Sequence, residues 1–464
     1  MTLRRTKIVA TIGPACDAPG VLRSVLAAGV DVARLNASHG SLEELGRRLA
    51  AVRAEAAALG REVGVLLDLP GPKLRVGMMG EGALLQEGAE FRLVVGECAG
   101  DARRACVTHD WLADDVSIDD RILLDDGALE LVVLGREGAD VLTRVVRGGV
   151  LHSHKGVNVP GVRLRVDGVT PHDFELLAWG LDAGVDLVAQ SFVRDHTDIT
   201  RLREAMGARR VPIVAKIEKH EALGDLEAIV AEADAVMVAR GDLAVETSPE
   251  AVPPAQRRIV AECRSAGKPV IVATQMLESM THAPRPTRAE ASDVATAVFE
   301  GADAVMLSEE TAIGEFPVEA VRTMDSVCRA AEEAGPPVPV VSRGCPIESP
   351  VAAAACALAR DTGARVIVTA TQSGATARAV ASLRPGQPVL AITPHAAVAR
   401  ALALVWGVVP AVTAGTRTVE ETTQVALAAV RAAGLATAGE CAVLTAGTTS
   451  GVTGSTDLIR LLTL

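Results

Sequence analysis

The chain has 464 residues, of which 49% are hydrophobic and 22% are charged, and its net charge at pH 7 is −12. This composition excludes a disordered chain and is sufficient for about three domains with sizeable cores. The acidic balance and the few aromatic residues (3 Trp, 5 Phe and no Tyr) argue against a nucleic-acid-binding surface. The uncharged stretch 401–416 is interrupted by Gly407 and Pro410 and is too short to span a bilayer. We therefore expect a cytoplasmic protein that binds neither nucleic acid nor a membrane.

Short apolar runs rich in β-branched residues recur along the chain, and each is followed by a segment with the hydrophobic pattern of a helix. Continuous apolar runs are typical of strands in a parallel sheet, which are buried on both faces. Eight such units predict an α/β fold with a closed (β/α)₈ TIM barrel in place of an open doubly wound sheet. Ser41, Asp195 and Thr287 are predicted to cap three of the helices. The eight runs are residues 7–12, 30–37, 63–69, 185–192, 211–217, 235–239, 269–274 and 302–307.

Two further domains are expected. The third and fourth runs are separated by many more residues than one helix needs, and residues 73–160 have the pattern of short strands joined by Gly and Asp turns. We expect a small β-barrel lid domain to be inserted here, which divides the barrel domain into residues 1–72 and 161–335. A proline-rich linker follows, and the strand and helix pattern beyond it predicts a C-terminal α/β domain over residues 345–464.

Polar residues follow several of the eight runs, and functional side chains of a βα barrel gather at the carboxyl ends of its strands. Alternate residues of a strand point the same way, so Arg34, Asn36 and Ser38 share a face, as do Lys216 and Glu218. Each residue alone is weak evidence, since an exposed Lys-x-Glu ion pair is common. The full set is Arg34, Asn36, Ser38, His39, Asp68, Leu69, Lys73, Arg75, Lys216, Glu218, Gly241, Asp242 and Thr274.

Glu218 and Asp242 follow neighbouring runs and supply the carboxylate oxygens that Mg²⁺ prefers. Arg34, Lys73 and Lys216 would surround an anion bound to that metal, an arrangement typical of phosphoryl transfer. Two other interpretations stay open at this point. A Mg²⁺-dependent lyase of the 2-keto-acid aldolase type would lack the inserted lid and the C-terminal domain. A non-catalytic binding protein would be expected to lack Lys216, Glu218 or Asp242.

These residues lie in segments through which the chain resembles the pyruvate kinase family over nearly its whole length. The segments AKIE, ARGDL, ATQMLESM and PRPTRAE occur in this order on the expected strands and are very specific. The resemblance implies transfer of a phosphoryl group from phosphoenolpyruvate to ADP, which gives pyruvate and ATP in the final step of glycolysis. It also implies Mg²⁺ or Mn²⁺ as cofactor, a homotetramer, and allosteric control by a phosphorylated effector. The other matching segments are TKIVATIGPA, DVARLNASHG, LDLPGPKLR, HKGVNVPG, GADAVMLSEETA and TQSGATA.

The resemblance also implies a role for each residue of the set. The metal ligands would be Glu218 and Asp242. The catalytic residues would be Lys216, Arg34, Thr274 and Lys73. The substrate would be bound by Arg34, Lys216, Gly241, Asp242 and Thr274, and the nucleotide by Asn36, His39, Arg75, Lys155 and Asp126. Whether Thr274 donates the final proton to the enolate, or relays it through the region of Ser308 and Glu310, stays open.

Lys73 departs from the pattern of the K⁺-dependent members of the family, which carry Glu at this position of the third-strand motif. This chain has Asp68-Leu69-Pro70-Gly71-Pro72-Lys73 there. A fixed ammonium supplies the positive charge that a bound K⁺ would otherwise supply, so we expect K⁺ independence. The alternative is that Lys73 is only a mobile residue of the lid hinge. If Lys73 supplies the charge of a bound K⁺, the residues that match the family's K⁺ site remain as a residual monovalent-cation region, which consists of Asn36, Ser38, Asp68 and Leu69.

A loop of the C-terminal domain matches the place where the family binds its phosphorylated effector. Thr371, Ser373, Gly374 and Thr376 lie between a predicted strand and a predicted helix, and their hydroxyl and backbone N–H groups are suited to a phosphate. The alternative is an ordinary capped turn, and no Lys or Arg lies inside the loop.

Overall fold

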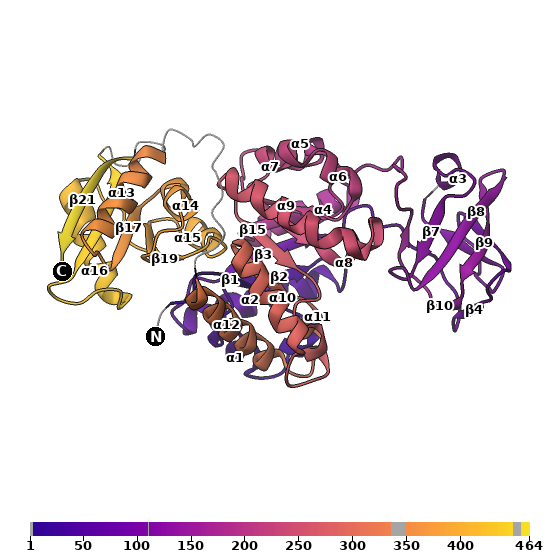
Figure 1. Cartoon of the computed structure of the whole chain (residues 1–464), viewed down its shortest axis with the longest axis horizontal. Helices are drawn as coiled ribbons and strands as arrows, with labels where there is room; N and C mark the ends of the chain where they lie inside the picture. The colour runs from indigo at the N-terminus through magenta and orange to yellow at the C-terminus, as the bar shows by residue number, and fades with distance from the viewer. Residues whose placement is uncertain (1–2, 110, 336–348, 449–455) are drawn as a thin grey trace.

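The computed structural model describes residues 3–109, 111–335, 349–448 and 456–464. The eight predicted runs form eight parallel strands that close into a barrel, so the predicted TIM barrel is confirmed. In Figure 1 the barrel lies at the centre of an elongated molecule, between the lid and the C-terminal domain. In their order around the barrel, the strands are β1 (Lys7–Thr11), β16 (Ala304–Leu307), β15 (Val270–Ala273), β14 (Ala235–Ala239), β13 (Ile213–Ile217), β12 (Leu187–Gln190), β3 (Gly64–Leu69) and β2 (Val32–Asn36).

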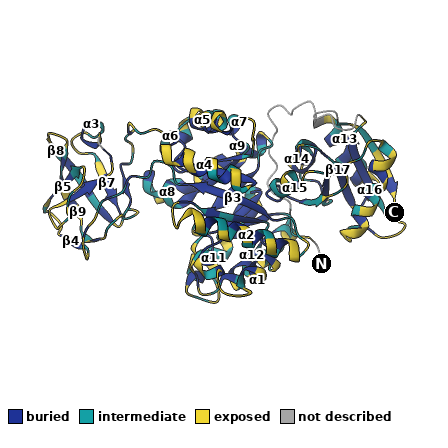
Figure 2. Ribbon diagram, turned by 180° about the vertical axis from the view of Figure 1, so that it is seen from behind, coloured by how far each residue is buried: buried dark blue, intermediate teal, exposed yellow. Residues whose placement is uncertain are grey.

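The barrel strands are buried almost throughout, which explains why their sequences are continuously apolar (Figure 2). Outward-facing residues pack against the surrounding helices in one large core, while inward-facing residues form a separate core inside the barrel. The predicted caps Ser41, Asp195 and Thr287 each accept a backbone N–H at the start of their helix. The helices of this domain are α1 (Val21–Ala27), α2 (Leu42–Ala58), α4 (Pro171–Ala183), α5 (His196–Met206), α6 (His220–Gly224), α7 (Leu226–Glu232), α8 (Arg240–Glu246), α9 (Val252–Ser265), α10 (Arg288–Glu300), α11 (Glu309–Ala312) and α12 (Pro317–Ala334).

The lid has a hydrophobic core of its own and consists mainly of strands. Its hydrogen bonds form a six-stranded sheet in the order β11-β7-β8-β9-β5-β6 and a second sheet of β10 and β4. Arg75 and Val76 bridge the two edges of the large sheet, to Gly156 beside β11 and to Val107 of β6, so the sheet closes on itself as the predicted small β-barrel requires. After β9 the chain passes close to β4 at Gly148, where an added Cβ would lie 2.4 Å from the Leu85 carbonyl oxygen, so this position requires glycine. The elements are β4 (Ala83–Leu85), β5 (Glu90–Val95), β6 (Arg104–Val107), α3 (Leu112–Asp115), β7 (Arg121–Leu124), β8 (Leu129–Glu137), β9 (Asp140–Arg147), β10 (Gly149–Leu151) and β11 (Val157–Asn158).

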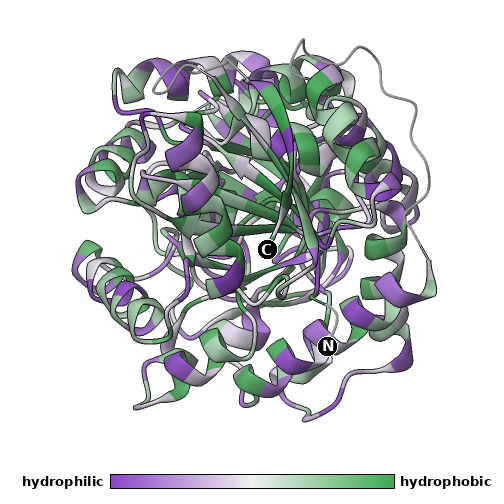
Figure 3. Ribbon diagram, turned by 90° about the vertical axis from the view of Figure 1, so that its left-hand side faces the viewer, coloured by the Kyte–Doolittle hydropathy of each residue, from purple (hydrophilic) through white to green (hydrophobic). Residues whose placement is uncertain are grey.

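The C-terminal domain is a five-stranded sheet with helices packed on it, as predicted. The strand order is β19-β18-β17-β20-β21, and only the last strand is antiparallel to its neighbour. Figure 3, seen from the side of this domain, shows hydrophobic strands at the centre and helices around them. Most of the predicted linker, and the first residues of the predicted domain, lie outside the described residues. The elements are α13 (Ser349–Asp361), β17 (Val366–Ala370), α14 (Ala375–Ser382), β18 (Val389–Thr393), α15 (Ala396–Leu402), β19 (Val408–Val412), α16 (Val419–Ala432), β20 (Cys441–Gly447) and β21 (Thr456–Thr463).

Candidate active site

Two side chains of opposite charge meet inside the barrel near the carboxyl ends of β2 and β3. Arg34 donates through Nε to Asp68 Oδ2 at 2.6 Å and through Nη1 to Thr11 Oγ1 at 2.9 Å. Arg34 and Asp68 follow the inward-facing Val32 and Leu66 by two positions, so the strand period directs both of them into the barrel interior. Asp68 therefore fixes the guanidinium of Arg34 at this end of the barrel.

Lys216 reaches the same place from β13. Its Nζ lies 3.3 Å from Asp68 Oδ1 and 3.0 Å from Glu218 Oε1, and it donates to Ser191 Oγ at 2.6 Å. Ser191 in turn donates to Asp68 Oδ1 at 3.2 Å. Ser191 is not among the predicted site residues, because the predicted run 185–192 includes it, whereas β12 ends at Gln190 and places Ser191 directly after the strand. These contacts join Arg34, Asp68 and Lys216 into one group, which we call the catalytic layer after the roles that the resemblance predicts for Arg34 and Lys216.

The opposite charges of the catalytic layer stabilise each other. Burial lowers the pKa of Lys216, but the carboxylates of Asp68 and Glu218 outweigh burial and hold this pKa above its ordinary value. Burial raises the pKa of Asp68, but Lys216 and Arg34 outweigh that effect and hold the pKa of Asp68 below its ordinary value. At neutral pH Lys216 is therefore an ammonium and Asp68 is a carboxylate.

Glu218 and Asp242 come from the ends of β13 and β14. Glu218 Oε2 accepts the backbone N–H of Phe192 at 2.6 Å, and Asp242 lies in the first turn of α8. Burial raises the pKa of Glu218, Lys216 opposes this rise, and the negative charge of Asp242 adds to it. A divalent cation between the two carboxylates would relieve this repulsion. Among the described residues no group of three or more His, Cys, Asp or Glu side chains could hold a metal. Two carboxylates are a donor set that suits Mg²⁺, because this ion keeps water and substrate oxygens among its ligands.

Lys73 links the start of the lid to this pair of carboxylates. Its Nζ lies 3.1 Å from Asp242 Oδ1 and 3.7 Å from Asp126 Oδ1 of the lid, and 5.8 Å from the centre of the Phe192 ring. Burial lowers the pKa of Lys73, but Asp242 and Asp126 outweigh burial and hold this pKa above its ordinary value. A permanent positive charge therefore lies beside one of the two predicted metal ligands.

Thr274 and Gly241 contact each other at the ends of β15 and β14. Thr274 Oγ1 accepts the backbone N–H of Gly241 at 2.9 Å and donates to the Ala273 carbonyl at 2.7 Å. Thr274 and Gln275 have φ angles of 66° and 54°, in the left-handed region that residues other than glycine rarely adopt. Arg240 holds this turn by donating to the Thr274 carbonyl from Nε at 3.2 Å and from Nη2 at 2.5 Å. The Thr274 hydroxyl is thus fixed in place by its surroundings.

Ser308 and Glu310 lie at the end of β16. Glu310 accepts the backbone N–H groups of Leu277 at 3.1 Å and of Ser308 at 2.6 Å, and burial raises its pKa. The Ser308 hydroxyl is buried and has no hydrogen-bond partner among the described residues. Both Thr274 and Ser308 therefore offer a hydroxyl for a proton path.

The predicted nucleotide residues of the lid lie on its hinge and on one tight turn. Arg75 donates through Nη1 to the His154 carbonyl at 2.9 Å, and Lys155 Nζ lies 2.8 Å from Asp125 Oδ1. Asp125 and Asp126 have φ angles of 53° and 51°, in the left-handed region that Asp adopts more readily than most residues in tight turns. Lys155 is paired within the lid, whereas Asp126 and Arg75 lie on the side of the barrel site.

His39 lies in the loop after β2, close to the cations of the site. Burial lowers the pKa of His39, and the positive charges of Arg75, Arg34 and Lys73 lower it further. His39 is therefore neutral at pH 7 and is available as a hydrogen-bonding group near the predicted nucleotide.

The residues of the predicted monovalent-cation region do not form one cluster of free oxygens. Asn36 Oδ1 accepts the backbone N–H of Ser38 at 3.1 Å, and Asp68 is paired within the catalytic layer. The side chain of Leu69 packs in the outer core of the barrel domain. Asp68 is thus the buried carboxylate of this region, and ammonium and guanidinium groups already neutralise it.

The predicted effector loop has the geometry of a capped turn. Thr371 Oγ1 accepts the backbone N–H of Gly374 at 2.9 Å, and Gly374, with a φ of 83°, precedes α14. The Thr376 hydroxyl lies 2.7 Å from the Thr456 hydroxyl at the start of β21, while Ser373 is exposed. The loop hydroxyls therefore connect the turn to the neighbouring strand.

Comparisons with known proteins match the chain from end to end. Residues 3–321 match the family model described as pyruvate kinase, barrel domain, and residues 349–462 match the one described as pyruvate kinase, alpha/beta domain. The pyruvate kinase of Geobacillus stearothermophilus is 44% identical over 99% of this chain and 80% of the relative. Pyruvate kinase 2 of Synechocystis sp. is 45% identical over 99% and 79%, and the pyruvate kinase of Mycobacterium tuberculosis is 44% identical over 99% and 98%.

These matches agree with the architecture and with the site. The inserted lid and the C-terminal domain, which a lyase of the aldolase type would lack, are both present. Lys216, Glu218 and Asp242, one of which a non-catalytic relative would be expected to lack, are all in place. The chain therefore belongs to the pyruvate kinase family and is a phosphotransferase.

Proposed function

We propose that this chain transfers the phosphoryl group of phosphoenolpyruvate to ADP, giving pyruvate and ATP in the final step of glycolysis. The observation that carries the proposal is the convergence of three cations and two carboxylates at the carboxyl end of the barrel. Phosphoenolpyruvate carries a phosphate and a carboxylate, so its binding requires both fixed cations and a metal. The five residues are Arg34, Lys73, Lys216, Glu218 and Asp242.

The residues of the catalytic layer stabilise the transferring phosphoryl group. Lys216 and Arg34 offset the charge on its oxygens, and they do so strongly because they are buried in a region of low dielectric constant. A bound Mg²⁺ or Mn²⁺, held by Glu218 and Asp242, would supply further Lewis-acid stabilisation of the same oxygens. Gly241 and Thr274 border the rest of the substrate, and the Thr274 hydroxyl donates or relays the proton that the enolate takes up. ADP is bound from the lid side by Asn36, His39, Arg75, Lys155 and Asp126.

The lid completes the site when it closes over the nucleotide. Lys73 and Asp126 already join the lid to Asp242 of the barrel, so closure is guided by opposite charges. Excluding water in this way protects the phosphoryl donor from hydrolysis.

The proposed reaction is tested by ADP-dependent formation of pyruvate from phosphoenolpyruvate in the presence of Mg²⁺. Coupling to lactate dehydrogenase reports pyruvate as a fall in NADH absorbance, and reactions without ADP or without phosphoenolpyruvate are the controls. We expect robust turnover that is lost on chelation of the divalent metal and restored by Mg²⁺ or Mn²⁺. No pyruvate from the intact protein would reject the proposal.

We also propose that the enzyme does not require K⁺. The support is the position of the Lys73 ammonium, 3.1 Å from Asp242 Oδ1 and held in its charged form by Asp242 and Asp126. The Lys73 ammonium thereby supplies the single positive charge that a bound K⁺ would otherwise supply.

Thr376→Ala is expected to weaken binding of a phosphorylated effector to the C-terminal domain by about tenfold, the effect of losing one hydrogen bond to a charged group. The proposed effector site is the loop of Thr371, Ser373, Gly374 and Thr376, supported by its hydroxyls and by the N-terminus of α14. Calorimetry with a sugar monophosphate, a nucleotide and a sugar bisphosphate measures the affinity and identifies the class. Thr437→Ala, at an exposed position of the same domain, is the matched control. Unchanged affinity in Thr376→Ala would make the loop purely structural.

We further propose a homotetramer in the cytoplasm. In the described part of the chain, no helix combines the length and the apolar character needed to cross a membrane. Sedimentation equilibrium of the intact protein tests the tetramer, and a monomeric mass at micromolar concentration would contradict it.

A further inference from the structure

The C-terminal domain contributes two side chains to the interior of the barrel. Ala403 and Leu404 directly follow α15, and each is only 2% exposed. They belong to the same hydrophobic core as inward-facing residues of all eight barrel strands, Val9 and Val32 among them. Figure 1 shows α15 at the side of the C-terminal domain that meets the barrel. The core inside the barrel thus includes two residues of the C-terminal domain, Ala403 and Leu404.

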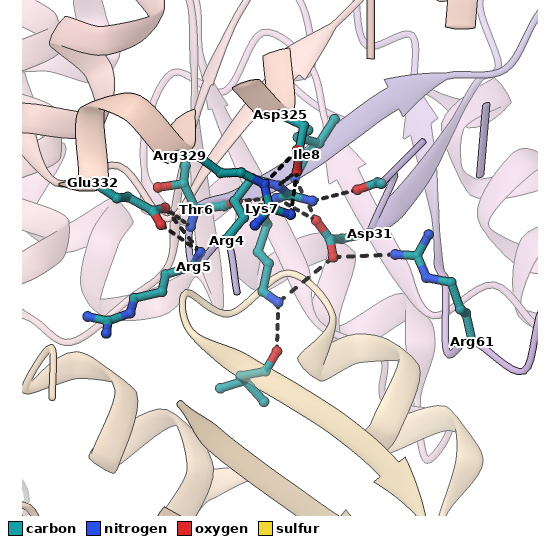
Figure 4. Close-up of polar contacts among 12 residues, drawn as sticks. Arg4, Arg5, Thr6, Lys7, Ile8, Asp31, Arg61, Asp325, Arg329 and Glu332 are labelled. Carbon is teal, nitrogen blue, oxygen red and sulfur yellow. Dashed lines mark hydrogen bonds and ion pairs between the residues drawn. The ribbon is translucent and has the colours of Figure 1, made fainter. Parts of the chain in front are cut away.

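The segment that carries Leu404 is attached to the N-terminal ends of the barrel strands. Lys7, at the start of β1, is buried and donates through Nζ to the Val408 carbonyl at 2.6 Å. Figure 4 shows Lys7 reaching toward the C-terminal domain with Asp31 beside it, and the two charged groups are 3.8 Å apart. Arg400 of α15 pairs through Nε with the buried Asp186 at 2.8 Å. Leu404 is therefore held in a fixed position at this end of the barrel.

The boundary between the barrel and the C-terminal domain contains both a close backbone contact and a cavity. An added Cβ at Gly64, the first residue of β3, would lie 2.7 Å from the Arg400 carbonyl oxygen, so the backbones nearly touch there. A cavity of about 2020 Å³ opens beside this contact, and its lining from both domains includes Lys7, Asp186 and Leu404. Ala403 and Leu404 are thus the residues through which the C-terminal domain contacts the core inside the barrel.

The core that Leu404 enters lies directly below the catalytic layer. Residues two positions apart on a strand share a face and are separated by about 6.6 Å. Close-packed interiors do not absorb a void without moving their neighbours. The residues one step below the catalytic layer are Val32 for Arg34, Leu66 for Asp68, and Val214 for Lys216.

We propose that Leu404 is a positioning residue for phosphoryl transfer, which fills the N-terminal end of the barrel and keeps the catalytic layer in its productive arrangement. The inference rests on the proposed roles of Arg34 and Lys216. Truncation of Leu404 leaves a void that the residues of the core fill only in part, and a displacement of about 1 Å at a catalytic group can cost about a hundredfold in rate.

Leu404→Ala in the full-length protein tests the proposal, with Leu390→Ala as the matched control. Leu390 is a fully buried leucine of β18 that lies in a core of the C-terminal domain outside the barrel. Both variants are expected to lower the melting temperature. Assayed well below both melting temperatures and at saturating substrates, only Leu404→Ala is expected to lower kcat, by about tenfold or more. The KM for ADP, which binds on the lid side, is expected to change less than about twofold, and Leu404→Met, which conserves volume, is expected to restore kcat.

A merely structural role gives a different result. If Leu404→Ala keeps the wild-type kcat while its melting temperature falls as in Leu390→Ala, Leu404 only seals the barrel and the inference is wrong. If Leu404→Ala does not fold, Leu404→Val replaces it, with Leu390→Val as its control and the same expected split between kcat and stability. Absence of ADP-dependent pyruvate formation by the intact protein would instead contradict the proposed function, so the two failures are distinguishable.

Discussion

Lys216→Met is expected to lower kcat by about a thousandfold or more, since it removes a buried charge that acts directly on the transferring group. Methionine has nearly the same length and volume as lysine, so the packing of the barrel interior is largely preserved. The variant leaves Asp68 without its ammonium partner at 3.3 Å and Glu218 without its partner at 3.0 Å. The net charge of the site then becomes more negative, which opposes the binding of an anionic substrate as well as its reaction.

The measurement is the steady-state rate of pyruvate formation at saturating ADP and Mg²⁺, with the fold checked by circular dichroism. Lys268→Met is the matched control, because Lys268 is another lysine of the barrel domain whose Nζ donates to the Ala233 carbonyl at 2.7 Å, away from the catalytic layer. It is expected to keep the wild-type kcat. A kcat for Lys216→Met within tenfold of the wild type would show that Lys216 does not act on the phosphoryl group.

Lys73→Glu is expected to make the enzyme dependent on K⁺. The wild-type protein should show full activity with Mg²⁺ in a buffer free of K⁺ and Na⁺, because the Lys73 ammonium already lies beside Asp242. In the variant, a carboxylate next to Asp242 and near Asp126 adds negative charge where the substrate is also negative. We expect kcat without K⁺ to fall by about a hundredfold and to recover largely when K⁺ is added.

The measurement is kcat as a function of K⁺ concentration, with a tetraalkylammonium salt keeping the ionic strength constant. Lys73→Gln separates loss of the ammonium from gain of the carboxylate, and it is expected to show a smaller fall and a weaker response to K⁺. A many-fold rise in the kcat of the wild-type protein on adding K⁺ would overturn the proposed role of Lys73. An equal loss in Lys73→Glu and Lys73→Gln, with no recovery in K⁺, would make Lys73 a hinge residue only.

The sequence predicts the barrel well because its physical signal is local. A strand buried on both faces must be apolar throughout, and all eight runs show this pattern. The polar residues at the strand ends are predicted for the same reason, since a polar residue directly after such a run must lie at the carboxyl end of the barrel. Lys216 and Asp68 both lie at this end of the barrel as predicted, and the structure shows that they form an ion pair. Ser191, which connects them, falls inside the predicted run 185–192, so the sequence does not mark it as a polar residue at a strand end.

The remaining features depend on partners that are distant in the sequence. The pairing of β10 with β4 follows from a close approach at Gly148 that no local pattern indicates. Leu404 lies in an apolar stretch that fits the core of its own domain equally well, so its place inside the barrel becomes visible only in three dimensions. The positive φ angle of Thr274 is likewise imposed by tertiary contacts, because a β-branched residue disfavours it.

The insertion of the lid between β3 and β12 has a consequence for how the chain folds. These two strands are hydrogen-bonded neighbours, yet the whole lid and α4 separate them along the chain. The entropy lost in closing a loop grows with the number of flexible residues inside it, and contacts between distant residues slow folding. A lid that folds first on its own core brings its two ends together and shortens the effective loop. During synthesis the first three strands leave the ribosome with an open edge, so we expect the lid to fold before the barrel closes.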